Sequence, residues 1–161
     1  MKTILTIAVF TFSIIALSNT ESSTAKNCSE VKNSCEYYSC IESKKQCGEF
    51  GYLQSFGQKY CQRFQDKISK KLSQRGRIWL QEVRSCLIDE LSKISPQIGC
   101  YGLKKMAFRS HVPCYQKTRF CELNKWDKYH VIKTLKSELK NRHVLAAGIR
   151  VLKSCRWIRF Y

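Results

Sequence analysis

Ten cysteines give this 161-residue chain its clearest chemistry, because paired thiols oxidise to disulfides. Their number is even, and no two of them have the Cys-x-x-Cys spacing that zinc sites use. Disulfides form in oxidising compartments, so we expect five of them in a secreted, extracellular domain. The ten positions are Cys28, Cys35, Cys40, Cys47, Cys61, Cys86, Cys100, Cys114, Cys121 and Cys155.

Three histidines, His111, His130 and His143, are the obvious candidates for proton transfer or metal binding. None belongs to an H-E-x-x-H or C-x-x-H array, so their spacing does not indicate a zinc site. No histidine precedes an aspartate, no glycine-rich calcium loop is present, and the acidic residues are too scattered for a paired-carboxylate hydrolase. We predict no metal, no cofactor and no catalytic residue, so the protein is not expected to be an enzyme. A hydrolase that lacks all of these motifs is kept as an alternative to this prediction.

The N-terminus predicts a signal peptide over residues 1–18. A short basic start precedes an almost wholly apolar run that ends in small residues suited to cleavage after Ser18. The rival reading, an uncleaved anchor, needs about 20 apolar residues, which is more than this run contains. Residues 19–27 are polar and should form a flexible lead-in. Asn27 begins a formal Asn-Cys-Ser sequon and is a candidate for N-glycosylation, although a disulfide at Cys28 would disfavour it.

The formal charge of the chain is +17. Such a charge favours anionic partners, and for an exported protein these are sulfated polysaccharide or acidic lipid surfaces rather than nucleic acid. Basic residues that merely solvate the outer faces of helices explain the composition equally well, because the charges are dispersed. Two basic and aromatic clusters lie at residues 69–79 and 153–161. The second is a candidate for contact with a lipid interface, but packing of Trp157 on the core is the more ordinary reading.

The apolar residues recur at helical spacing along most of the chain. One stripe predicts a helix over residues 53–72, and a second follows a break at Gly76 and ends at Ser95-Pro96. A third helix is expected over residues 99–110, bounded by a turn that holds His111 and Pro113, with a short fourth over residues 114–121. The stripes comprise Leu53, Phe56, Tyr60, Phe64, Ile68 and Leu72, and then Trp79, Val83, Leu87, Leu91 and Ile94.

Two further helices complete the chain. Asn124 has the features of an N-cap, with Asp127 three residues later. Cys121 and Cys155 bracket these two helices, and a disulfide between them would staple a helical hairpin. Hairpin-turn dipeptides are missing, so residues 28–161 are predicted to form one all-α, disulfide-stapled domain of about five to seven helices. The two faces comprise Trp126, Tyr129, Ile132, Leu135 and Leu139, and then Val144, Leu145, Gly148, Val151, Leu152 and Ile158.

The cysteine ladder and its neighbouring residues resemble stanniocalcin, a family of secreted, all-helical, disulfide-linked glycoprotein hormones. All ten cysteines find a counterpart in order, from Cys28 to Cys155. The resemblance rests on four short motifs and two cysteine gaps. The motifs are Cys35 and Cys40 followed by Ile41-Glu42, Cys61-Gln62-Arg63-Phe64, Gly76-Arg77-Ile78-Trp79 and Cys86-Leu87-Ile88. The gaps are those from Cys100 to Cys114 and from Cys114 to Cys121.

The resemblance implies a pairing and a function. The implied pairs are Cys28 with Cys40, Cys35 with Cys61, Cys47 with Cys100, Cys86 with Cys114, and Cys121 with Cys155. The implied function is that of a hormone or ligand in calcium and phosphate homeostasis that acts by binding an extracellular protein receptor. The alternative is a cationic secreted protein, of a defence type, that binds anionic membrane or polysaccharide.

The chain departs from the family in three ways. The gap between Cys47 and Cys61 is longer, the family's glycosylation site after Cys40 is missing, and the extra cysteine that links two subunits is absent. A homodimer is possible, but we do not expect it to be linked by the family's intersubunit disulfide.

Overall fold

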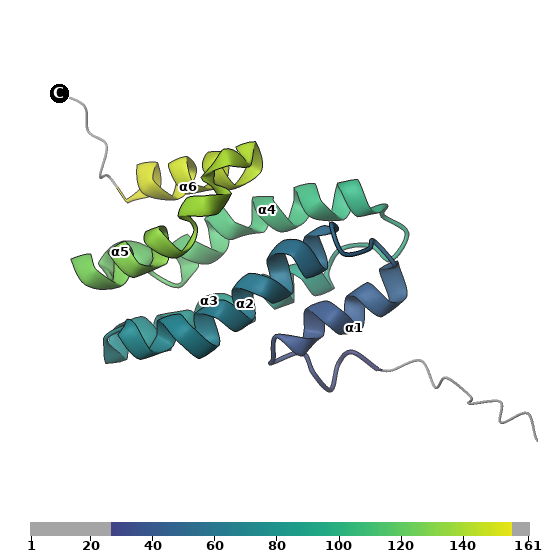
Figure 1. The fold of residues 1–161 in the computed structure, drawn as a ribbon, viewed down its shortest axis with the longest axis horizontal. Helices are drawn as coiled ribbons and strands as arrows, with labels where there is room; N and C mark the ends of the chain where they lie inside the picture. Colours follow the sequence, from purple (N-terminus) through teal and green to yellow (C-terminus); the bar gives the residue numbers. More distant parts are fainter. Residues whose placement is uncertain (1–26, 156–161) are drawn as a thin grey trace, which may run out of the picture.

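The computed structural model describes residues 27–155 and folds them into six α-helices without a β-strand, as the sequence predicts (Figure 1). The predicted signal peptide, most of the predicted lead-in and the tail from residue 156, which includes Trp157 and Ile158, lie outside the described residues. The helices are α1 (Glu36–Lys45), α2 (Lys59–Arg63), α3 (Gln74–Ser92), α4 (Cys100–Lys117), α5 (Lys125–Thr134) and α6 (Arg142–Ser154). The short helical segments are η1 (Leu53–Gln58), η2 (Phe64–Ile68), η3 (Ser69–Lys71), η4 (Phe120–Glu122) and η5 (Lys136–Lys140).

The helix predicted over residues 53–72 is present, but it alternates between α-helical and π-helical turns. Segments η1 and η2 are π-helical and flank α2. The apolar residues here recur every fourth position, and a four-residue step over-rotates a 3.6-residue helix by about 40°. The wider π turns compensate for this drift. All six residues of the predicted stripe are consequently buried.

Helix α3 begins at Gln74, so the predicted break at Gly76 is wrong. Ser73 is the N-cap, and its hydroxyl accepts the backbone N–H of Gly76 at 3.1 Å. Gly76 lies in the first turn of α3. Its position suits a glycine because the Asp127 carboxylate occupies the space beside it, and a Cβ there would lie 2.7 Å from that carboxylate. The glycine therefore marks close packing between α3 and α5 rather than an interruption.

Helix α4 continues through Pro113, so the predicted boundary at Val112-Pro113 and the separate helix from Cys114 are both wrong. Proline removes one backbone hydrogen bond from a helix interior. The helix continues because the next residue, Cys114, is fully buried and bonded to Cys86 in α3, while the proline ring lies on the exposed side. His111 accordingly lies within α4 and not in a turn.

Helices α5 and α6 form the predicted C-terminal hairpin. Asn124 caps α5 by accepting the backbone N–H of Asp127 at 2.8 Å, which confirms the predicted N-cap. Most of the predicted apolar face lies outside the core, however: Trp126 is 73% exposed and Tyr129 and Ile132 are also exposed, whereas Leu135, just after α5, packs against the core. The residues of α5 that face inward are Asp127, Lys128 and Val131.

Helix α4 is the central element, with α3 packed on one side and α6 on the other, and α1 packs against η1 (Figure 1). A single core, centred on Leu53, Trp79 and Leu103, runs through these contacts. Five disulfides join the elements in the pairs that the stanniocalcin resemblance implies: Cys28–Cys40, Cys35–Cys61, Cys47–Cys100, Cys86–Cys114 and Cys121–Cys155. The last pair closes the hairpin of α5 and α6.

Candidate functional site

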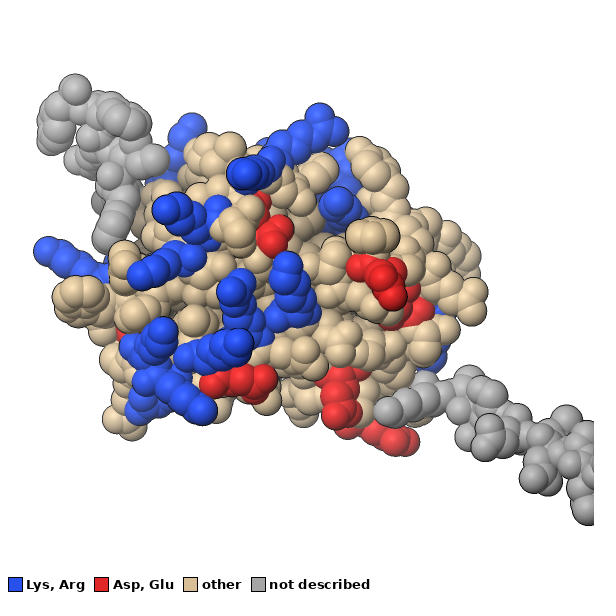
Figure 2. All heavy atoms as spheres, in the orientation of Figure 1, with Lys and Arg blue, Asp and Glu red and all other residues tan. Residues whose placement is uncertain are grey.

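The C-terminal hairpin, defined here as residues 125–154, presents a strongly basic surface. It contains eight Lys and Arg residues against two acids. Figure 2 shows basic side chains over the upper left of the face, where α5 and α6 lie in Figure 1, and also over the lower left and centre, where α2 and α3 lie, while most acidic side chains lie lower and to the right. The exposed basic residues of the hairpin are Lys125, Lys133, Lys136, Lys140, Arg142, Arg150 and Lys153.

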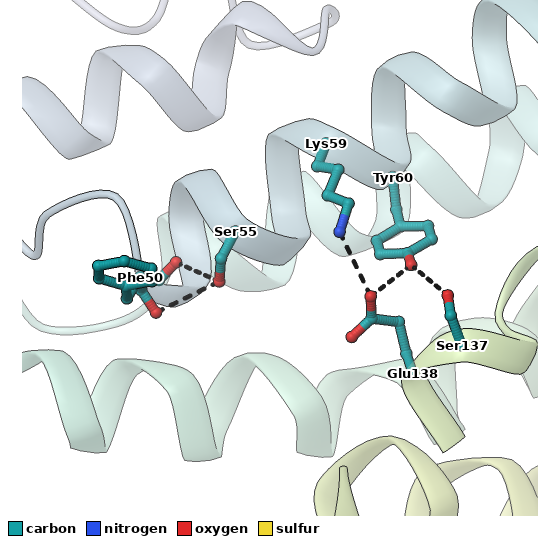
Figure 3. Close-up of polar contacts among 7 residues, drawn as sticks. Phe50, Ser55, Lys59, Tyr60, Ser137 and Glu138 are labelled. Carbon is teal, nitrogen blue, oxygen red and sulfur yellow. Dashed lines mark hydrogen bonds and ion pairs between the residues drawn. The ribbon is translucent and has the colours of Figure 1, made fainter. Parts of the chain in front are cut away.

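Both acids of the hairpin are engaged in internal contacts. Asp127 is 1% exposed and accepts the Ser73 hydroxyl at 2.5 Å. Glu138 accepts the Tyr60 hydroxyl at 2.6 Å and pairs with Lys59 at 3.4 Å, which anchors η5 to α2 (Figure 3). Burial and this carboxylate together raise the pKa of Tyr60. Both carboxylates therefore make their contacts with residues outside the hairpin, Asp127 with Ser73 and Glu138 with Tyr60 and Lys59, rather than with the exposed cations of the hairpin.

The eighth basic residue, Lys128, is buried in the hairpin. Its ammonium donates to the backbone carbonyl of Cys121 at 2.6 Å, and burial lowers its pKa. This contact fixes the start of α5 against the residue that is disulfide-bonded to the end of α6.

Exposed apolar residues lie among the cations. Trp126 and Tyr129 meet edge to face with ring centroids 6.1 Å apart, and Lys133 lies 5.2 Å from the centre of the Tyr129 ring. Four aliphatic residues of the hairpin, Ile132, Leu139, Leu145 and Ile149, are between 37% and 44% exposed. An exposed surface that combines aromatic, aliphatic and basic residues is suited to contact with a partner or an anionic surface.

The four aliphatic residues also line a cavity of about 200 Å³ beneath α6. We call these four residues the mouth, because they lie both at the surface and on the cavity wall. The deeper wall is apolar and aromatic, and none of the cavity's lining residues is an Asp, Glu, Lys or Arg. The deeper residues are Phe56, Phe108, His111, Tyr115, Phe120, Val131, Leu135, Val144, Ala147, Gly148, Val151 and Leu152.

His111 is the ionisable imidazole on this wall. Its Nδ1 donates to the backbone carbonyl of Ala107 at 2.8 Å, and its ring contacts Phe56 and Phe108. Burial lowers the pKa of His111 to about 4, so the ring is neutral at physiological pH. Burial likewise raises the pKa of the neighbouring Tyr115 phenol to about 12. The wall of the cavity is therefore uncharged.

The structure does not gather the three histidines into a cluster with acidic or cysteine side chains. His143 stacks on Phe108 at 5.8 Å, and His130 contacts the Tyr129 ring. Within the described part of the chain, no group of three or more His, Cys, Asp or Glu residues is arranged to hold a metal ion. Both histidines thus make ring contacts on the hairpin and its neighbour α4.

The remaining predicted positions have simple surroundings. Asn27 is exposed, and its side-chain oxygen accepts the backbone N–H of Ser29 at 3.2 Å. In the basic cluster at residues 69–79, Trp79 is 1% exposed and belongs to the core. A shallow groove of about 760 Å³ on the α3 side is lined by both charges, and Lys32 and Asp89 pair there at 2.7 Å.

None of the helices formed by residues 27–155 combines the length and apolar character needed to cross a bilayer. No family model matches the chain, and searches of curated proteins and of solved structures find no similar protein.

Proposed function

We propose that the protein is a secreted, stanniocalcin-like ligand that binds an extracellular protein receptor, without catalysis, and takes part in calcium and phosphate homeostasis. The observation that carries the proposal is the disulfide pairing. Ten cysteines can pair in roughly 900 ways, and the five pairs of this structure are those that the resemblance implies.

The exposed aromatic pair on α5 supports a role in protein recognition. Trp and Tyr are enriched among the residues that dominate binding at protein interfaces. Trp126 keeps 73% of its surface accessible although other aromatic residues nearby enter the core. We therefore place the receptor contact on α5, around Trp126 and Tyr129.

The test measures phosphate uptake by epithelial cells treated with the purified, oxidised protein. We expect a saturable change in uptake that is lost on reduction and alkylation of the protein. Trp126→Ala should weaken the response at least tenfold without lowering the melting temperature. Phe50→Ala is the matched control, because Phe50 is 93% exposed but lies outside the hairpin. No response to the native protein, or equal potency of both variants, would contradict the proposal.

A second candidate function, binding to anionic membrane or polysaccharide, is favoured by the seven exposed cations of the hairpin. Salt distinguishes the two functions, since the Debye length falls to about 8 Å at physiological ionic strength and to about 3 Å at 1 M. Binding to heparin or to phosphatidylserine vesicles should collapse over this range if it is the main activity. A packed protein interface should survive it.

A further inference from the structure

The cavity beneath α6 has the size and lining of a ligand site. Its volume is about 200 Å³. An engineered apolar cavity of about 150 Å³ stays free of water and takes up benzene. The cavity here is larger, carries no charged side chain and opens to the surface through the mouth. An aliphatic chain can therefore enter it from solvent.

The residues next to the mouth indicate what chemical group the aliphatic chain would carry at its outer end. Three of its four residues are followed directly by an exposed basic residue: Ile132 by Lys133, Leu139 by Lys140, and Ile149 by Arg150. Of the two acids of the hairpin, Asp127 is buried against Ser73, and Glu138, which precedes Leu139, pairs with Lys59 of α2. We call these three cations, each next in sequence to a mouth residue, the basic rim. A charge-free apolar cavity beside them is complementary to a molecule with an apolar tail and an anionic head.

We infer that this cavity binds the alkyl chain of a single-chain anionic amphiphile, such as a fatty acid, with the carboxylate held at the basic rim of the mouth. The inference is independent of the proposed function, because it concerns a soluble ligand inside the domain and not a receptor or a bilayer on its surface.

Gly148 provides a way to close the site. It lines the cavity, and a Cβ at this position would meet no atom within 4 Å. Gly148→Leu should therefore fill part of the cavity while improving the helix propensity of α6. Ala147→Leu is a second blocking variant, since Ala147 also lines the cavity. Ala146→Leu is the matched control, because Ala146 is exposed on the same helix and does not line the cavity.

The experiment is a calorimetric titration of the oxidised protein with monomeric sodium decanoate. We expect saturable binding to one site, a loss of affinity of at least tenfold in Gly148→Leu and in Ala147→Leu, and no change in Ala146→Leu. Decanol should bind more weakly than decanoate, because it lacks the charge that the rim complements.

Three results would overturn the inference. The first is no saturable heat with decanoate in the folded protein, and the second is unchanged affinity in both blocking variants. The third is a dimer that Leu145→Glu dissociates and that takes up no decanoate, which would assign the mouth to a second copy of the chain. Equal affinity for decanol and decanoate would overturn the assignment of an anionic head.

Discussion

The Asp127 carboxylate accepts the backbone N–H of Ser73 at 2.8 Å, which ties the first turn of α5 to the start of α3. The same carboxylate accepts the Ser73 hydroxyl and the side-chain amide of Asn124. Two helix N-termini, separated by about fifty residues of sequence, thus share one buried acid that also suits the positive ends of both helix dipoles.

Replacing this acid should destabilise the domain. Asp127→Ala leaves the partly buried donors of Ser73 without their acceptor, and such a loss costs about 1–3 kcal/mol of unfolding free energy. Urea denaturation of the oxidised protein measures it. Asp66→Ala is the control, because Asp66 is exposed and its loss should change stability by less than about 0.5 kcal/mol. Equal effects of the two variants would show that the shared cap contributes nothing.

Gly76 and Gly148 should respond oppositely to alanine. At Gly76 the new Cβ would lie 2.7 Å from the held Asp127 carboxylate, so we expect Gly76→Ala to destabilise the protein by about 1–3 kcal/mol. At Gly148 a Cβ meets no atom within 4 Å, and helix propensity should stabilise Gly148→Ala by about 0.5–1 kcal/mol. Melting temperatures of the two variants measure the difference. Shifts of the same sign would refute the close packing at Gly76.

His111 should make stability depend on pH. Its pKa is about 4 in the folded protein and 6.5 as a free group, so the unfolded chain binds more protons between these values. The stabilising contribution is complete above pH 6.5 and is lost as the pH falls towards 4. The loss should reach about 3 kcal/mol, given 1.36 kcal/mol for each pKa unit.

The comparison that isolates this residue is His111→Gln against the unmodified protein, by denaturant titration from pH 4 to pH 7. Contributions of other groups, the carboxylates included, are common to both proteins and cancel in the difference. The unfolding free energy of the unmodified protein minus that of His111→Gln should become smaller as the pH falls from 7 to 4. A constant difference across the range would mean that the imidazole titrates as it does in water.

Several features were predictable from local sequence. The helical periodicity placed the elements, and the Asn124 cap followed from its position three residues before Asp127. The buried stripe from Leu53 to Leu72 was also predictable, and its four-residue repeat is itself a signal for the π turns.

The errors arose where tertiary contacts override local preference. Pro113 and Gly76 have the features of helix boundaries, but a disulfide at Cys114 and the packing of Asp127 keep both residues inside helices. The periodicity of α5 identifies its apolar face, but it does not show whether a neighbouring element of the fold covers that face. The cavity was missed for a related reason: it is formed jointly by residues of η1, α4, α5 and α6 and of the segments between α4 and α6, so no single segment of the sequence indicates it.

The disulfide pairing is the central claim, and a peptide map of the purified, oxidised protein under non-reducing conditions tests it most directly. We predict cross-linked peptides that join Cys28 to Cys40, Cys35 to Cys61, Cys47 to Cys100, Cys86 to Cys114, and Cys121 to Cys155. A peptide that joins Cys35 to Cys40, or a free thiol at Cys121, would contradict both this architecture and the likeness to stanniocalcin.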